Sequence, residues 1–198
     1  MTLSIDNLKE IMKKLADNRH VFHSEADFQH SLALEIKDYK RELELRLEKF
    51  VGIEKNEKKK DKSVYMDLVI IDKNKKIVSA IELKYKTFTK SKNGTKQTIQ
   101  DEDYFLKRQG AEDLGRYDFL KDIKRLESFN KEHNCQKSFA IMLTNDKHYW
   151  DSKYGKDGFS EEFCIGDKTE PSPSPFSLIV LAMKKAPLGL TIISGSSF

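Results

Sequence analysis

The segment "IVSAIELKYK" (residues 77–86) decides the fold, because its alternation predicts a β-strand that carries charge on one face only. Successive side chains of a strand point to opposite faces, so Glu82 and Lys84 lie on the same face. The two preceding residues on that face, Val78 and Ala80, are apolar. A strand face whose first side chains are apolar and whose later side chains are charged indicates the rim of a cleft. A Glu–Lys pair on an open sheet face is the alternative.

The preceding segment, "SVYMDLVIID" (residues 63–72), places Asp67 inside an almost continuous apolar run, which predicts a strand covered on both faces. An unpaired buried carboxylate is costly, so Asp67 needs a cation, a hydrogen-bond donor or a proton. A structural ion pair is the alternative for one isolated aspartate. Adjacent strands lie about 4.8 Å apart, so Asp67 and Glu82 could share one divalent ion if their strands pair in register.

The segment "SEADFQHSLALEIKDY" (residues 24–39) predicts a helix with Ser24 as its N-cap and Asp27 as the return arm of a capping box. At 100° per residue, Glu25 lies within about 20° of Leu32, in the middle of the apolar stripe. The helix dipole favours any carboxylate in the first turn and is a sufficient explanation for Asp27. It does not explain why Glu25 points toward the core. For Glu25, a carboxylate that only stabilises the helix end and a carboxylate with a functional role both stay open.

Apolar spacing and turn residues predict the remaining elements. They are an amphipathic helix over 4–16, a half-buried strand over 41–50, a long helical region from about 103 to 130, and strands over 138–146 and 176–183. The lysine-rich residues 87–98 are expected to form a loop with Asn93 and Gly94 at its tip. Gly110 and Gly115 indicate a break or a close approach in the long helix. This order of elements predicts an α/β sandwich built on one sheet.

Composition sets broad limits on the kind of protein. A chain of 198 residues can bury the core of one domain, and its net charge of +4 permits a polyanionic partner without requiring one. Cys135 and Cys164 have neither metal-ligand spacing nor a disulfide framework. The polar first residues do not resemble a signal peptide, and the apolar run 176–183 is too short to cross a bilayer. We therefore expect a soluble, cytoplasmic protein without a membrane partner.

One carboxylate from a helix, one from a strand and a Glu-x-Lys from the next strand are the groups that phosphodiester hydrolysis uses. Oxygen ligands hold Mg²⁺, the ion polarises the phosphate and activates a water, and an amine stabilises the attacking hydroxide or the developing charge.

The arrangement Glu25 … Asp67 … Glu82-Leu83-Lys84 resembles the PD-(D/E)xK nuclease superfamily, which includes many restriction endonucleases, resolvases and repair exonucleases. By this resemblance Asp67 is the first acid of the motif, Glu82 the second and Lys84 the lysine. Glu25 matches the acid on the preceding helix, and Met66 stands where the nominal motif has proline. The resemblance implies a restriction-endonuclease-like αβββαβ core, with a central mixed sheet flanked by helices.

The resemblance also implies an auxiliary residue on the helix that leads to the fourth strand. Gln109 matches it, and Arg116 lies within about 20° of Gln109 on a helical wheel, so both could reach a phosphate. A charged, solvated helix is the alternative. The lysine-rich residues 54–62 and 84–96 could likewise contact a nucleic-acid backbone or form solvated loops.

The sequence thus predicts a single nuclease domain over 1–198, with an N-terminal helix (1–19), the αβββαβ core (20–145) and a C-terminal loop, strand and tail (146–198). We expect Mg²⁺, with Mn²⁺ as a substitute, to be bound by Asp67, Glu82 and Glu25 and to serve cleavage of DNA. Lys84 would position water and Gln109 would assist. The alternatives are a catalytically silent nucleic-acid-binding module and an α/β interaction domain with a buried ion network. RNA as substrate, endonuclease or exonuclease action and a homodimer stay open.

Overall fold

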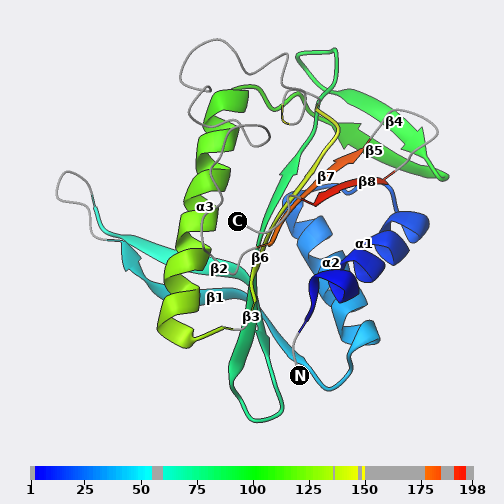
Figure 1. The fold of residues 1–198 in the computed structure, drawn as a ribbon. Coiled ribbons are helices and arrows are strands. Elements are labelled where there is room, and N and C mark those ends of the chain that lie inside the picture. The colour runs from blue at the N-terminus through cyan, green and yellow to red at the C-terminus, as the bar shows by residue number, and fades with distance from the viewer. Residues whose placement is uncertain are drawn as a thin grey trace.

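The computed structural model describes residues 3–54, 60–135, 137–146, 149, 177–183 and 190–194, the last two ranges as backbone (Figure 1). In chain order the elements are α1 (Ile5–Asn18), α2 (Glu25–Tyr39), β1 (Glu44–Glu54), β2 (Lys62–Ile71), β3 (Ile77–Lys86), β4 (Thr95–Ile99), β5 (Glu102–Leu106), α3 (Glu112–His133), β6 (Phe139–Thr144), β7 (Ser177–Met183) and β8 (Leu190–Ser194). Cys164 and the lysines within 55–59 lie outside the described residues.

The described strands form one six-stranded mixed sheet in the order β1-β2-β3-β6-β7-β8. The pairs β1–β2, β2–β3 and β7–β8 are antiparallel, whereas β3–β6 and β6–β7 are parallel. The predicted α/β class with a mixed sheet is therefore confirmed. The order α2-β1-β2-β3-α3-β6 also follows the prediction, with a separate β4–β5 hairpin inserted after β3. The tail, which had no sequence assignment, contributes strand β8.

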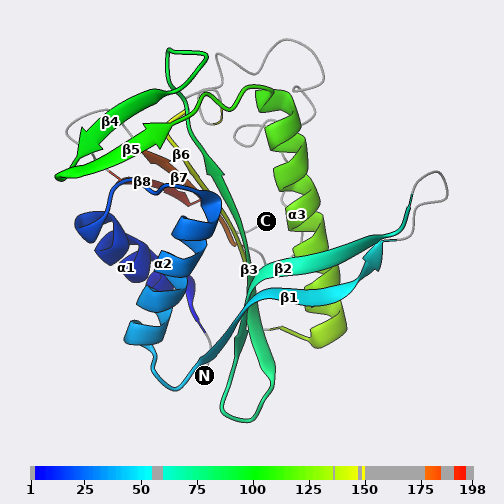
Figure 2. The ribbon, with the colours of Figure 1, turned by 180° about the vertical axis from the view of Figure 1, so that it is seen from behind.

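Helices cover both faces of the sheet, α1 and α2 on one side and α3 on the other (Figure 2). The α1–α2 side is an apolar cluster that includes Leu83 and Tyr85 of β3. The α3 side is a second cluster that includes Ala80 of β3. Because side chains alternate along a strand, Glu82 and Lys84 face α3. The charged face of β3 therefore lies under α3 and is not open to water.

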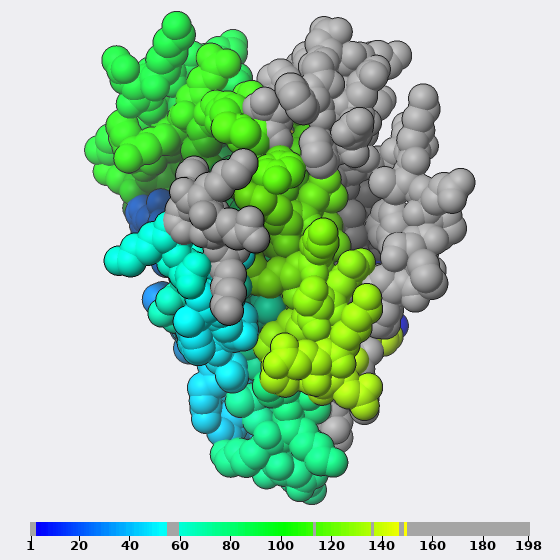
Figure 3. All heavy atoms as spheres, turned by 90° about the vertical axis from the view of Figure 1, so that its left-hand side faces the viewer, coloured from blue at the N-terminus to red at the C-terminus, as the bar shows by residue number. Residues whose placement is uncertain are grey.

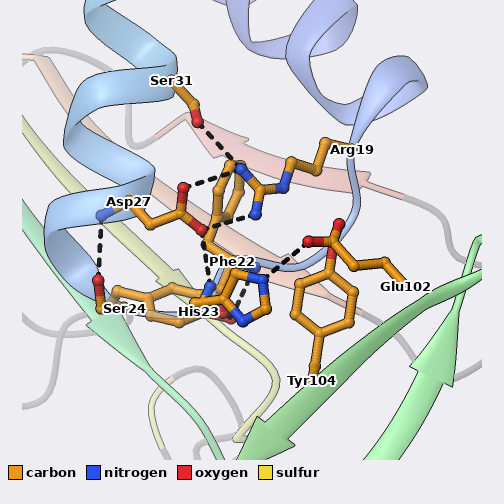
Figure 4. Close-up of polar contacts among 9 residues, drawn as sticks. Arg19, Phe22, His23, Ser24, Asp27, Ser31, Glu102 and Tyr104 are labelled. Carbon is orange, nitrogen blue, oxygen red and sulfur yellow. Dashed lines mark hydrogen bonds and ion pairs between the residues drawn. The ribbon is translucent and has the colours of Figure 1, made fainter.

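The two N-terminal helices begin where their caps predict. Ser4 caps α1 in a full capping box with Asn7. The Ser24 hydroxyl accepts a hydrogen bond from the Asp27 N–H, so the predicted start of α2 is confirmed. The predicted return arm is wrong, because the Asp27 carboxylate instead takes two hydrogen bonds from the Arg19 guanidinium, at 2.8 and 2.7 Å (Figure 4).

The predicted helix over 103–130 is wrong in its first turns, since α3 begins at Glu112 and residues 95–106 form the β4–β5 hairpin. Tyr104 and Leu106 are buried while the residue between them is exposed, which is the period of a strand. The hairpin turns at Gln100 and Asp101, both with positive φ. The predicted turn at Asn93 and Gly94 lies just before β4, where the Gly94 N–H donates to the Ser91 carbonyl and Gly94 has a positive φ.

A polar cluster holds this hairpin against the loop before α2 (Figure 4). The His23 ring stacks on Tyr104 with 4.6 Å between ring centroids, and its Nε2 lies 2.8 Å from Glu102 Oε1. The Tyr104 hydroxyl donates to the other Glu102 oxygen at 2.5 Å. The cluster fixes the hairpin beside the N-terminus of α2, which carries Glu25.

Gly110 and Gly115, which the sequence analysis singled out, have different surroundings. They therefore provide a matched test of packing. A Cβ at Gly115 would overlap the hydroxyl of Tyr149, which is buried, whereas a Cβ at Gly110 would meet nothing within 4 Å. We expect Gly115→Ala to lower the free energy of unfolding by about 1–2 kcal/mol, because overpacking outweighs the gain of about 1 kcal/mol in helix propensity. Urea denaturation measures the change, with Gly110→Ala as the control. A stabilised Gly115→Ala would contradict this close approach.

Candidate functional site

The site begins where β2 and β3 separate. Over their described lengths these strands pair only from Ile71–Ile77 to Leu68–Ile81, after which β3 continues beside β6. Backbone N–H groups of β3 beyond that point need other acceptors, because buried donors are normally satisfied. Figure 3 shows the three elements that lie around this region on one side of the molecule: β1–β2 in cyan, α3 in yellow-green and the β4–β5 hairpin in green.

Two carboxylates replace the missing strand partner. Asp67 Oδ2 accepts from the Leu83 N–H at 2.6 Å, and Glu25 Oε2 accepts from the Tyr85 N–H at 2.7 Å. Asp67 lies one residue beyond the last β2–β3 pair, and Glu25 is the first residue of α2. Both predicted acids are therefore placed along one edge of β3 by hydrogen bonds to its backbone.

The other two predicted residues project toward α3 and meet opposite charges there. Glu82 is 1% exposed, and its Oε1 accepts from the Arg125 guanidinium at 2.7 Å. The Lys84 ammonium lies 2.7 Å from Asp122 Oδ2. Arg125 also lies 3.2 Å from Asp122 Oδ1, so a chain of ion pairs runs Glu82–Arg125–Asp122–Lys84. Asp122 and Arg125 are three residues apart on α3 and so share a helix face.

The four predicted residues act electrostatically on one another. Burial raises the pKa of Asp67, Lys84 and Glu82 oppose that rise, and Glu25 adds to it. Glu25 and Asp67 also favour the charged form of Lys84. Glu25, Asp67, Glu82 and Lys84 thus converge at the separation of β2 and β3.

Burial and mutual repulsion perturb the two strand carboxylates. Burial, together with the charge of Asp67, raises the pKa of Glu82 to about 9, although Arg125 opposes the rise. Burial also raises the pKa of Asp67 to about 6, against the Leu83 N–H and Lys84. Burial alone would lower the pKa of Lys84, but Asp122 and Glu25 outweigh it and the pKa is raised.

The charge count at the site is unbalanced when every group is ionised. The acids are Glu25, Asp67, Glu82 and Asp122, and the bases are Lys84 and Arg125. These four acids outnumber the two bases, so an ionised site carries net negative charge, which favours a cation. Carboxylate oxygens are the ligands that Mg²⁺ prefers. In charge and donor type the residues fit that ion, but no group of three or more His, Cys, Asp or Glu side chains within the described residues forms a ready metal cage.

Gln109 is placed differently from the prediction. It precedes α3, in the loop after β5, so the helical-wheel relation with Arg116 does not hold. Its backbone N–H donates to the Thr87 carbonyl at 3.2 Å. Its side-chain Oε1 is buried and has no hydrogen-bond partner among the described residues. Arg116 is buried in α3, with its guanidinium carbon 5.9 Å from the centre of the Tyr149 ring.

Sequence reasoning missed four residues of the site: Asp122, Arg125, Gln29 and Glu48. Gln29 is 5% exposed, and its side-chain amide donates to the Asp67 carbonyl at 2.5 Å and to Glu48 Oε1 at 3.0 Å. Glu48 lies opposite Asp67, between two paired positions of β1 and β2, in a left-handed conformation. The signal for Gln29 was present, because it follows Glu25 by four residues and lies on the same helix face.

Comparison with known proteins gives no match to a protein-family model, to a curated protein or to a solved structure. Across the described residues, none of the helices has the length and apolar character that a membrane span requires.

Proposed function

We propose that this chain is a metal-dependent nuclease of the PD-(D/E)xK type that hydrolyses phosphodiester bonds, with DNA as its substrate. The observation that carries the proposal is the convergence of Glu25 and Asp67 on the edge of the strand that bears Glu82 and Lys84. The excess of acidic over basic side chains among these groups and their α3 partners supports a divalent cation. The element order α2-β1-β2-β3-α3-β6 supports the restriction-endonuclease-like form of the fold.

In this proposal Asp67, Glu82 and Glu25 hold Mg²⁺, for which Mn²⁺ can substitute. Such an ion, when bound, polarises the phosphate and lowers the pKa of a water. The raised pKa of Lys84 keeps its ammonium charged, so it can donate to the attacking water or to a phosphate oxygen. Asp122 fixes that ammonium through the 2.7 Å contact, and hydrogen bonds from the β3 backbone fix Asp67 and Glu25.

A nuclease assay with Mg²⁺ or Mn²⁺ on supercoiled, linear and single-stranded DNA, and on RNA, tests the proposal. We expect metal-dependent cleavage that falls at least about 100-fold in Lys84→Ala and in Asp67→Asn, since each removes a group that acts on the reacting phosphate. Lys14→Ala is the matched control, because Lys14 lies on α1 and pairs with Glu35 and Asp38 at the surface. Circular dichroism checks folding. If both site variants cut like wild type, the proposal is wrong.

One observation favours a second candidate, an interaction domain stabilised by a buried ion network. The ion pairs that link Glu82, Arg125, Asp122 and Lys84 already have N···O distances of 3.2 Å or less, so each charge has a partner. In that case Mn²⁺ would leave the melting temperature unchanged, whereas an ion that binds the native state should raise it. A protein that binds DNA with steep salt dependence yet releases no fragments would instead be a silent binding module.

A further inference from the structure

Glu82, the most deeply buried of the proposed metal ligands, already has a cationic partner. The Arg125 guanidinium donates to its Oε1 at 2.7 Å. The two side chains differ in exposure, since that of Glu82 is 1% exposed and that of Arg125 is 33% exposed. Glu82 is held within the sheet, whereas Arg125 reaches it from α3 and borders solvent. If this pair separates, the arginine is the partner that can move.

Arg125 has a second acceptor that would remain when it leaves Glu82. Asp122 Oδ1 lies 3.2 Å from the guanidinium, one turn back on the same helix. The other Asp122 oxygen lies 2.7 Å from Lys84. A released guanidinium would therefore keep a charged partner and a path to solvent, which avoids the large cost of an uncompensated buried charge. Lys84 would keep its position as well, because its contact with Asp122 does not involve Arg125.

We propose that Arg125 is an internal competitor for the metal. It holds Glu82 Oε1 in the metal-free protein and releases that oxygen when a divalent cation binds, so α3 sets the metal affinity of the site. This inference rests on the proposed function, because it assumes that Glu82 is a ligand. It predicts that Arg125 lowers the metal affinity, whereas a residue that only positions Glu82 would raise it.

Calorimetric titration of the full-length chain with Mn²⁺ tests this role without relying on activity. We expect Arg125→Gln to bind Mn²⁺ at least about fivefold more tightly than wild type, since glutamine leaves Glu82 without a competing charge. The metal-free variant should also melt at a lower temperature than metal-free wild type. Lys121→Gln is the matched control: it removes one positive charge from the same helix, at a residue that pairs with Asp118 and lies over Tyr117.

Each outcome of the titration decides the inference. Equal or weaker Mn²⁺ binding by Arg125→Gln overturns it but leaves the nuclease proposal standing if wild type binds Mn²⁺ and cuts. An equal gain in Lys121→Gln also overturns it, because the effect would then be general electrostatics. No Mn²⁺ binding by wild type or by Arg125→Gln overturns both. If Arg125→Gln does not fold, Arg125→Lys replaces it; its weaker, non-planar hold on Glu82 should still give tighter binding than wild type, and unchanged affinity overturns the inference.

Discussion

Glu82→Gln is expected to raise the melting temperature of the metal-free protein at pH 8 and to abolish metal-dependent cleavage. The pKa of Glu82 is raised from its ordinary value of 4.5 to about 9, by burial and by the charge of Asp67. Between these values the folded state holds a proton that the unfolded state has lost, so stability falls as the pH rises. One such group contributes a slope of at most about 1.4 kcal/mol per pH unit. Glutamine does not titrate, so this loss of stability is absent, and its Oε1 can still accept a hydrogen bond from Arg125.

Melting curves from pH 5 to pH 9, recorded with a chelator present, measure this difference. The stability of wild type should decline across the range, whereas Glu82→Gln should lack that part of the slope and be the more stable form at the alkaline end. Glu42→Gln, at an exposed residue, is the control and should follow wild type. A Glu82→Gln variant that keeps the full wild-type slope would show that the carboxylate of Glu82 is not the source of the pH dependence.

Asp122→Ala is expected to destabilise the protein by about 3 kcal/mol, the largest effect of any single substitution at the site. Removing one partner of a buried ion pair leaves the other charge without compensation, which costs about 3–5 kcal/mol. Asp122 is 3% exposed and bridges Lys84 and Arg125. The partial exposure of Arg125 places the expected loss at the lower end of that range. Urea denaturation measures the loss through the transition midpoint.

Two further variants separate burial from charge in this result. Asp118→Ala removes the same group one turn earlier on α3, where its pair with Lys121 is exposed and 3.7 Å long, and should cost at most about 1 kcal/mol. The double variant Lys84→Met/Asp122→Leu replaces the buried pair with apolar groups and should recover most of the stability lost in Asp122→Ala. Equal losses in Asp118→Ala and Asp122→Ala would mean that the α3–β3 network contributes nothing beyond a surface pair.

Sequence patterns predicted the elements well where periodicity was strong. The helix that begins after Ser24 and the strands that carry Asp67 and Glu82 appear where the apolar spacing indicates. The prediction was wrong over 95–98, where β4 lies in the expected loop, and over 103–106, where β5 lies in the expected helix. A short strand with two apolar residues at period two can also be fitted to a helical pattern that continues into α3. That error also misplaced Gln109, which lies before the helix rather than on it.

By itself, the sequence determined the α/β class, the face of β3 that carries Glu82 and Lys84, and the direction of Glu25, because side-chain periodicity is a local property of the chain. Only the tertiary structure decided what those groups meet. Asp67 and Glu25 are joined to β3 because the β2–β3 ladder stops at Leu68–Ile81, and a ladder's end is set by how whole strands diverge. The ion pairs with Asp122 and Arg125 depend on how α3 packs across the sheet, which no local spacing of charged residues can specify.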